Sequence, residues 1–210
     1  IRVESNTTGV CDFRINGADD KRRATRLSFS HNQFNTASVG DYVSRITFAD
    51  NDIQGMLKLD APDSAGLITV AGNRISASGE GSIRLSGKEI TDVRIRDNDI
   101  RPGGGDGIVL QGVCDVIISG NNVSGCTSGI VLRDCERFDV CDNILSRNQN
   151  GIVLTWADSL GQVHNNIFRD NSRAGIRITR GAGKPPPTLL MKDNQHTGSA
   201  KEVEITESAE

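Results

Sequence analysis

Aromatic side chains are scarce in this 210-residue chain. Phe, Tyr and Trp together make up 4% of the residues, with one Trp and one Tyr. A core with few aromatic rings must be filled by aliphatic side chains, and hydrophobic residues make up 36% of the sequence. Proline is also rare, at five residues, whereas glycine is common, at 23. This composition is typical of a narrow aliphatic core with a tight turn at each corner.

Other absences exclude whole classes of partner. The formal net charge is −3, so no basic field would attract nucleic acid. No apolar run approaches the roughly 20 residues that a membrane-spanning helix needs. The chain begins with Ile1 and has no charged and then apolar leader, so we expect either a processed protein or an excised piece of a longer one, and we favour the excised piece. We predict no nucleic-acid partner and no membrane span.

The five cysteines form no C-x-x-C pair and make an odd count, which indicates neither a zinc site nor a complete disulfide framework. Cys114 and Cys135 fall near the same corner of adjacent repeats, where a disulfide would be within reach. Free, stacked thiols are the alternative, and both remain open at this point. The number and spacing of the cysteines do not indicate the cellular compartment of the protein.

A short phrase repeats at the centre of the chain. Gly-Ile-Val-Leu occurs at 107–110, 129–132 and 151–154, in steps of 22 residues. Between the copies lies a second phrase, an apolar residue followed three positions later by Asn. Two short apolar strands per period, with a fixed polar residue at one corner, predict a stacked solenoid.

The corner asparagines can be followed through the whole chain. They are Asn6, Asn32, Asn51, Asn73, Asn98, Asn121, Asn143, Asn166 and Asn194. Asn tolerates the left-handed backbone region, and its side-chain amide can bond the same group one coil above and below. We therefore predict an all-β parallel solenoid of about nine coils, with an asparagine ladder at one corner.

Period-two alternation predicts which side chains of the repeated phrase face outward. The Ile and Leu of each copy would point inward, and the central Val would point outward. Val109, Val131 and Val153 would then form one exposed apolar ridge. The solenoid itself does not require such a ridge, which would suit contact with a protein partner or with a second copy of the chain.

The Asn corner together with the Gly-Ile-x-Leu strand resembles the right-handed parallel β-helix of the pectate-lyase-like superfamily. The resemblance covers residues 1–206 as a single domain and leaves 207–210 as a frayed tail. It implies a fold that serves lyases, hydrolases, epimerases, phage tailspikes, adhesins and non-catalytic modules alike. It also implies an extracellular, periplasmic or phage-particle location, and working residues on the Gly-Ile-x-Leu sheet.

That face offers few groups for hydrolysis. A glycoside hydrolase needs two carboxylates about 5–10 Å apart, and no two adjacent coils both supply an acid there. Asp106 resembles the Asp of the Asp-Gly-Ile segment in polygalacturonases. Its equivalents in the next coils are Ser128 and Asn150, so a turn role for Asp106 is the simpler interpretation.

A lyase or epimerase would instead need a base near the sugar and a cation that neutralises the uronate. Arg84, Arg133 and Arg177 are the candidates, although they are spread over several coils. The predicted ligand-binding set on the same face is Gln111, Arg133, Thr155, Trp156 and Arg177. The Pro-stiffened loop 180–187 is either one wall of a groove or a plain surface insertion.

Cys141 and His164 form the sharpest local constellation. They occupy equivalent positions of adjacent coils on the strand before the Asn corner, about 5 Å apart at Cα, which allows a thiol–imidazole contact. No third group that would orient the imidazole is evident. An exposed His beside a free Cys is the simpler interpretation.

Acidic residues also collect beside the Asn corner. Asp97 and Asp99 flank Asn98, and oxygen ligands within one coil are what a calcium site would use. Asp beside a turn is ordinary, so surface pairs with arginine are the simpler interpretation, and we expect no cofactor.

Three hypotheses about function follow. The first is a β-helix domain that binds a polysaccharide or a protein partner without catalysis. The second is a polysaccharide lyase or uronate epimerase, ahead of a glycoside hydrolase, that acts on the Gly-Ile-x-Leu sheet. The third is a structural spacer that associates through the valine ridge. Short turns and the lack of paired acids favour the first and the third.

Overall fold

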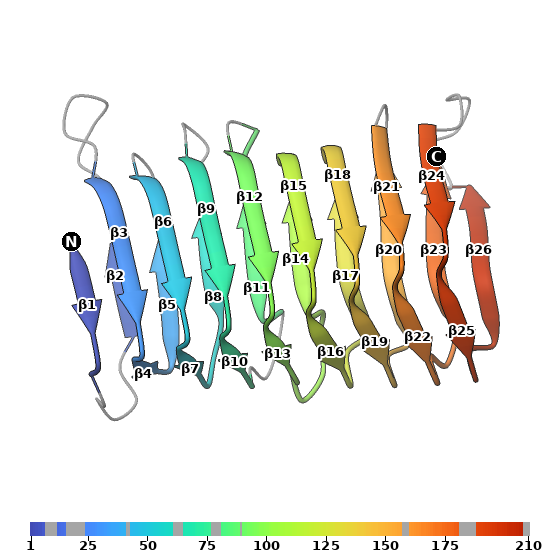
Figure 1. Ribbon diagram of the computed structural model, residues 1–210, viewed down its shortest axis with the longest axis horizontal. Helices are drawn as coiled ribbons and strands as arrows, with labels where there is room; N and C mark the ends of the chain where they lie inside the picture. Colours follow the sequence, from blue (N-terminus) through green and yellow to red (C-terminus); the bar gives the residue numbers. More distant parts are fainter. Residues whose placement is uncertain are drawn as a thin grey trace.

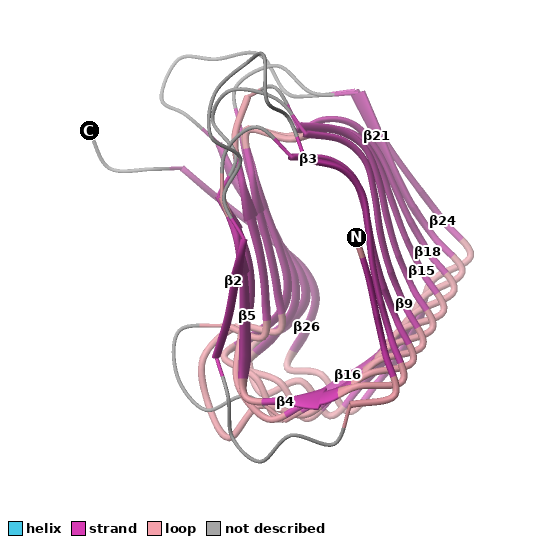
Figure 2. Cartoon of the chain, turned by 90° about the vertical axis from the view of Figure 1, so that its left-hand side faces the viewer, coloured by secondary structure: helices cyan, strands magenta, loops and turns pink. Residues whose placement is uncertain are grey.

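The computed structural model describes residues 1–6, 12–15, 24–40, 43–60, 65–76, 81–88, 90–156, 160–180 and 188–207. Within these ranges the chain forms strands and turns, and it contains no helix with the length and hydrophobicity that crossing a membrane requires. The strands wind into a right-handed parallel β-helix whose coils stack along one axis (Figure 1). Viewed along that axis, three sheets enclose the core (Figure 2). The predicted all-β solenoid is confirmed.

Each sheet takes one strand from each successive coil. Sheet A contains β1 (Arg2–Glu4), β3 (Ala24–Ser30), β6 (Val43–Ala49), β9 (Ala65–Ala71), β12 (Ile90–Arg96), β15 (Cys114–Ser119), β18 (Glu136–Cys141), β21 (Leu160–His164) and β24 (Thr188–Lys192). Sheet B contains β4 (Gln33–Phe34), β7 (Asp52–Ile53), β10 (Arg74–Ile75), β13 (Asp99–Ile100), β16 (Asn122–Ser124), β19 (Ile144–Ser146), β22 (Ile167–Arg169) and β25 (Gln195–Thr197). Sheet C contains β2 (Asp12–Ile15), β5 (Thr36–Val39), β8 (Leu57–Asp60), β11 (Ile83–Ser86), β14 (Ile108–Gln111), β17 (Ser128–Arg133), β20 (Asn150–Trp156), β23 (Ala174–Arg180) and β26 (Lys201–Glu207).

The strand register places equivalent positions of successive coils side by side. Ile108 pairs with Ile130, and Ile130 pairs with Ile152, as the 22-residue steps predicted. These isoleucines are fully buried. The core is therefore a stack of similar, mostly aliphatic layers, into which Phe29, Phe48 and Phe168 are also buried. Burying apolar area contributes about 25 cal/mol per Å².

The asparagine ladder is confirmed at the corner between sheets A and B. Asn121 illustrates the pattern. Its Nδ2 donates to Asn143 Oδ1 at 2.9 Å, and its Oδ1 accepts from Asn98 Nδ2 at 2.9 Å and from the backbone N–H of Asn98 at 3.0 Å. Nδ2 also donates to the carbonyl of Ile95 in the coil below. Because every polar group has a partner, these amides can be buried without the cost of an unsatisfied donor.

The left-handed backbone conformation at this corner lies one residue earlier than the sequence predicted. The left-handed residue is the one before each ladder Asn, not the Asn itself. The described examples are Ser5, His31, Asp50, Gly72, Asp97, Gly120, Asp142, Asn165 and Asp193. Asp, Asn and Gly adopt this conformation at low cost, which accounts for the acids beside the ladder.

A second asparagine row, which the repeats did not reveal, stabilises the corner between sheets B and C. Asn148 Oδ1 accepts from the backbone N–H of Cys126 at 2.9 Å, and Asn171 Oδ1 accepts from that of Asn148 at 3.1 Å. Both asparagines are buried. The available signal was a spacing of 23 residues between two asparagines that each follow a ladder Asn by five positions.

The glycine of the repeated phrase is required by close packing. A Cβ built at Gly107 would lie 2.5 Å from the carbonyl oxygen of Gly129 in the next coil and 2.6 Å from a methyl of Val123. Real Cβ atoms do not approach other atoms so closely, so a larger residue would push the coils apart.

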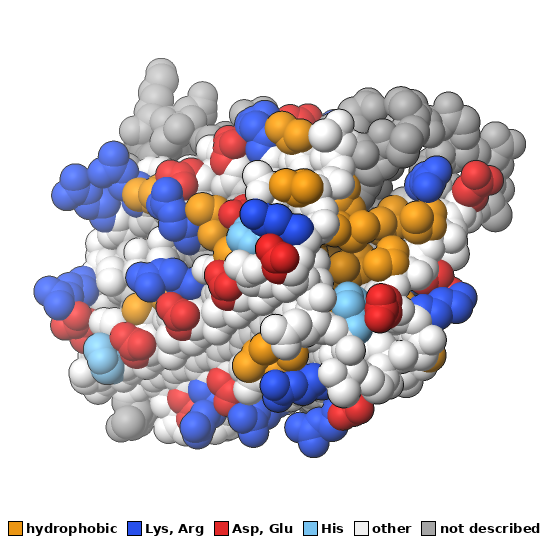
Figure 3. All heavy atoms as spheres, turned by 45° about the vertical axis from the view of Figure 1, so that its right-hand side comes forward, with side chains coloured by type: hydrophobic (Ala, Val, Ile, Leu, Met, Phe, Trp, Pro, Cys, Tyr) orange, Lys and Arg blue, Asp and Glu red, His pale blue; other side chains and the backbone are white. Residues whose placement is uncertain are grey.

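The last coil leaves part of the core open. Val203 and Ile205 pair in register with the buried Ile176 and Ile178, yet they are 38% and 53% exposed. Hydrophobic side chains gather at this end of the solenoid in Figure 3. Strand β26 ends at Glu207, so it includes the first residue of the predicted frayed tail. Residues 208–210 lie outside the described ranges.

Candidate functional site

The outer face of sheet C carries the predicted ligand-binding row. Gln111, Arg133 and Thr155 are direct neighbours in the strand register, so this part of the row is formed. Their side chains are exposed or half-buried. Trp156 ends β20, but its side chain lies outside the described part of the structure, as do residues 181–187 of the predicted loop.

The three candidate arginines do not form one cluster. Arg84 and Arg177 occupy equivalent positions in the strand register of sheet C, but three intervening coils carry valine at that position. Arg133 lies two residues further along its strand. Arg177 Nε lies 3.6 Å from Glu204 Oε2 on the next strand. Arg177 is thus already opposite a carboxylate, which competes with a uronate for the guanidinium.

Glu204 is the centre of an ion-pair network on β26. Lys201 Nζ lies 2.7 Å from Oε1, and Arg173 Nε lies 2.8 Å from Oε2. The hydrogen bonds from Lys201 and Arg173 hold the pKa of Glu204 below its ordinary value of 4.5. The carboxylate therefore stabilises the last coil while it is ionised.

We expect Glu204→Gln to lower the urea midpoint of unfolding at pH 7. A folded-state pKa below the unfolded value gives stability that is present above the unfolded pKa and lost as pH falls through the folded pKa. The variant and the wild type should therefore converge in acid. Urea unfolding at a series of pH values measures this, and a difference that is the same at every pH would contradict the role of the charge.

The prediction of an exposed valine ridge is wrong for two of its three residues. Val109 is 3% exposed and Val131 is 2% exposed, while Val153 is half-buried. The chain at Gly81 lies over Val109, because a Cβ at Gly81 would be 3.6 Å from its Cγ2. Val131 is flanked in register by the other two valines. A surface for self-association at this position would first need to be uncovered.

A groove that the sequence did not predict lies on the outer face of sheet A. Its lining comes from five consecutive strands, β12, β15, β18, β21 and β24, and its volume is about 620 Å³. It crosses the strands and therefore runs along the solenoid axis. Asp92, Asp115 and Arg137 have positive φ at equivalent positions of three coils, so the strands bulge there. We call this hollow the sheet A groove.

The sheet A groove combines aliphatic and charged side chains. Ile117, Leu160 and Leu190 line it and are 41%, 58% and 51% exposed. Arg137 donates to both carboxylate oxygens of Asp115, at 2.6 and 3.0 Å. This contact holds the pKa of Asp115 below its ordinary value. An apolar residue at an outward strand position, Ile117, was the signal that sequence reasoning missed.

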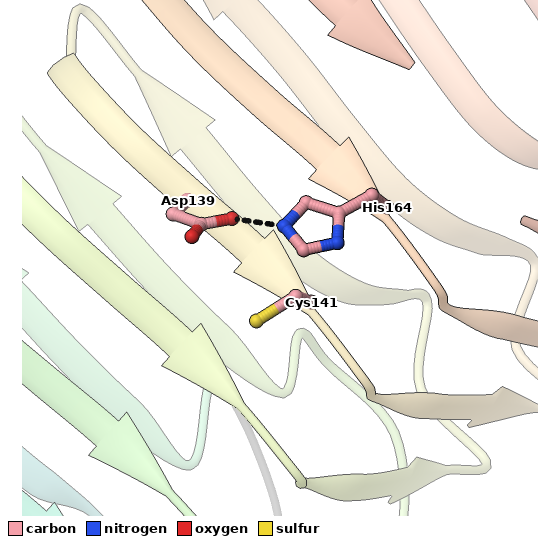
Figure 4. A group of neighbouring side chains, drawn as sticks. All are labelled: Asp139, Cys141 and His164. Carbon is pink, nitrogen blue, oxygen red and sulfur yellow. Dashed lines mark ion pairs between the residues drawn. The ribbon is translucent and has the colours of Figure 1, made fainter. Parts of the chain in front are cut away.

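Three side chains with metal-ligating or catalytic chemistry meet beside the groove (Figure 4). Cys141 and His164 pair in register on β18 and β21, as predicted. Asp139, which lines the groove, lies two residues before Cys141 and shares its face, and its Oδ1 is 3.0 Å from His164 Nε2. A third group that was not evident from the sequence therefore lies beside the imidazole, because alternate residues of β18 project from the same face of sheet A.

Cys141 and His164 are more buried than predicted. Cys141 is 9% exposed, and the side chain of His164 is 18% exposed, so neither is the freely solvated group that the sequence indicated.

A family model described as a right-handed β-helix region matches residues 37–195. The chain belongs to the right-handed β-helix family. No curated protein matches it at a significant level. Membership establishes the fold and is consistent with the pectate-lyase-like resemblance, but this fold hosts unrelated functions, so it assigns no substrate.

Thiol catalysis at Cys141 of the β-helix does not fit the local electrostatics. Burial, with the carboxylates of Asp139 and Asp142, raises the pKa of the Cys141 thiol to about 12. The thiol is thus protonated at neutral pH, whereas a nucleophile must be a thiolate. His164 Nδ1 is buried and has no hydrogen-bond partner among the described residues, so this nitrogen is not presented to a substrate.

Asp106 lies in the turn before β14 of the β-helix. Its carbonyl accepts from the backbone N–H of Ser82 at 3.1 Å. Ser128 and Asn150 are neighbours in register and offer no acid in the two following coils. A second carboxylate for sugar hydrolysis is therefore not supplied by these positions.

The predicted calcium candidates are each paired with arginine. Arg96 Nη1 lies 3.3 Å from Asp97 Oδ2, and Arg101 Nε lies 3.0 Å from Asp99 Oδ1. Asp99 also lines a small hollow of about 290 Å³ together with Arg74 and Arg101. These contacts match the simpler interpretation of surface pairs.

Four cysteines of the β-helix are described, and no disulfide joins any two of them. Cys135 Sγ lies 3.5 Å from the carbonyl oxygen of Leu110, and Cys114 Sγ lies 4.0 Å from Glu136 Oε2. Cys114 pairs in register with Glu136, not with Cys135. No disulfide therefore joins this pair, and the two thiols are also offset by one position and not stacked in register.

Proposed function

We propose that this β-helix domain binds a linear polysaccharide in the sheet A groove without cleaving it. The observation that carries the proposal is the direction of the groove, which follows the solenoid axis over five coils. Successive coils repeat every ~4.8 Å, so the lining offers contact points at regular intervals along the groove. A polymer with repeating units can use such an array, whereas a compact ligand contacts only part of it.

The chemistry of the lining suits sugars. The exposed aliphatic side chains of Ile117, Leu160 and Leu190 give a floor for the C–H faces of sugar rings. Asp115 and Arg137 provide acceptors and donors for hydroxyl groups at the rim. Aromatic platforms are usual in sugar sites, and here aliphatic side chains would take that place.

Binding fits the groove better than hydrolysis does. A general acid in a glycosidase needs a raised pKa, and the pKa of Asp115 is lowered by Arg137. A lyase or epimerase remains the second hypothesis, with its candidate arginines on sheet C.

The test is retention of the chain in gels that contain uronate-rich or neutral polysaccharides. Leu160→Asp should weaken retention about tenfold, equivalent to about 1.4 kcal/mol, because it places a charge on the apolar floor. Arg133→Ala on sheet C is the matched control and should leave retention unchanged.

Each other outcome argues against the proposal. Loss of retention in Arg133→Ala alone would move the ligand to sheet C. No retention of the wild type on any polysaccharide would remove the carbohydrate function. Release of unsaturated products by the wild type would instead establish a lyase.

A further inference from the structure

Asp139, Cys141 and His164 together present the donor set of a transition-metal site. Each offers one ligand atom, and the oxygen, sulfur and nitrogen atoms lie within 4.8 Å of one another. The three side chains come from two adjacent strands of sheet A, so the backbone ladder fixes their relative positions. Figure 4 shows the carboxylate and the imidazole facing one another beside the thiol.

The spacing is close to that of a metal centre. Zinc binds sulfur at about 2.3 Å and nitrogen or oxygen at about 2.0–2.2 Å, so neighbouring ligand atoms of a tetrahedral site are about 3–4 Å apart. The Asp139 Oδ1 to His164 Nε2 distance is 3.0 Å. Small side-chain rotations would bring the three donors onto one ion.

The contacts of the three donors are ones that a metal ion could replace, because the Cys141 thiol is hydrogen-bonded to Asp142 and Asp139 faces His164. Although Oδ1 of Asp139 is 3.0 Å from the imidazole, it is buried and makes no hydrogen bond of acceptable geometry in the described structure. Asp142 adds a further negative charge near the Cys141 thiol. Lys192, in register with His164, is the cation on the adjacent strand, and its side chain is exposed. A buried carboxylate oxygen that lacks a hydrogen bond, next to a thiol and an imidazole, is an environment that a bound cation would complete.

We propose that Asp139, Cys141 and His164 bind one zinc ion, with a fourth coordination position left for water or an exogenous ligand. A thiolate and an imidazole favour zinc over calcium or magnesium, which prefer all-oxygen sites. Coordination replaces the proton of the thiol with the metal. The site is separate from the predicted calcium candidates Asp97 and Asp99. It does not depend on the polysaccharide proposal, because a chain that retains no glycan can still bind zinc.

The test is a titration of the full chain, freed of metal by a chelator and kept reduced, with Co²⁺ as a spectroscopic probe. A Co²⁺–thiolate bond gives a charge-transfer band in the near ultraviolet. We expect the band to saturate at one Co²⁺ per chain and to disappear when Zn²⁺ is added. Absence of the band in the wild type would overturn the proposal.

Matched variants assign the site. Cys141→Ser should abolish the band and weaken Zn²⁺ binding by about 100-fold or more, since even loss of a supporting residue costs 10–100-fold. Cys114→Ser removes a less buried thiol, and His31→Gln removes an exposed imidazole beside Asp50, so both should bind as the wild type does. A band that persists in Cys141→Ser would overturn the assignment.

Folding is checked separately because Cys141 is buried. Circular dichroism and the metal-free unfolding midpoint should match those of the wild type. If Cys141→Ser does not fold, Asp139→Asn replaces it, because that side chain is 40% exposed and the change is nearly isosteric. Weaker Zn²⁺ binding by folded Asp139→Asn supports the site, and unchanged affinity contradicts it.

Discussion

Replacing Asn121 by leucine is expected to lower the free energy of unfolding by about 3–6 kcal/mol. The substitution nearly conserves volume but removes the ladder amide in the middle of the stack. The buried backbone N–H of Asn98 then loses its acceptor, and the carbonyl of Ile95 loses a donor. Each buried group left without a partner costs about 1–3 kcal/mol, and the amide of Asn143 also loses its neighbour.

Urea unfolding measures this loss, and the next residue provides the control. Asn122 is half-buried and donates to Asp99 Oδ1 at 3.1 Å on the outside of the coil. Asn122→Ala should therefore cost less than about 1 kcal/mol. If the two variants were equally stable, the ladder would not be a main source of stability.

Gly151→Ala is expected to cost about 2–3 kcal/mol, for a steric reason. The added Cβ would lie 2.5 Å from the carbonyl oxygen of Gly175 and 2.5 Å from a ring carbon of Phe168. The carbonyl belongs to the parallel ladder and cannot move without shifting the next coil. Phe168 is fully buried, so its ring has little space to turn away.

The matched control is Gly103→Ala. A Cβ at Gly103 would have no atom within 4 Å, and the residue is exposed. The control should change stability by less than about 0.5 kcal/mol. Thermal or urea unfolding of the two variants separates the steric effect from the general effect of replacing glycine by alanine. Equal stability of both variants would contradict the close-packing argument.

The fold was predictable because the residues that specify it recur periodically along the sequence. The Ile and Leu of each Gly-Ile-Val-Leu copy recur at a fixed spacing, and one register of the strands buries all of them. The ladder asparagines were equally visible, since each must match the residue in the coil above and below. Asn148 and Asn171 were missed because their row is short and lacks that long repetition.

The site residues depend on neighbours that differ from coil to coil. Alternation correctly predicted that Val109 and Val131 point away from the core, but not that the surrounding chain covers them. Gln111, Arg133 and Thr155 were placed correctly as a row, because only the register was needed.

The sequence by itself determined the solenoid, its register and the ladder, since hydrophobic periodicity and repeated Asn positions report on contacts between equivalent residues. Only the tertiary structure decided where the surface is hollowed and which polar groups meet. The contact between Asp139 and His164 runs diagonally between two strands. The sheet A groove is lined by five strands, three of which bulge at Asp92, Asp115 and Arg137. Such features depend on the conformation of individual side chains and turns, which no repeat period encodes.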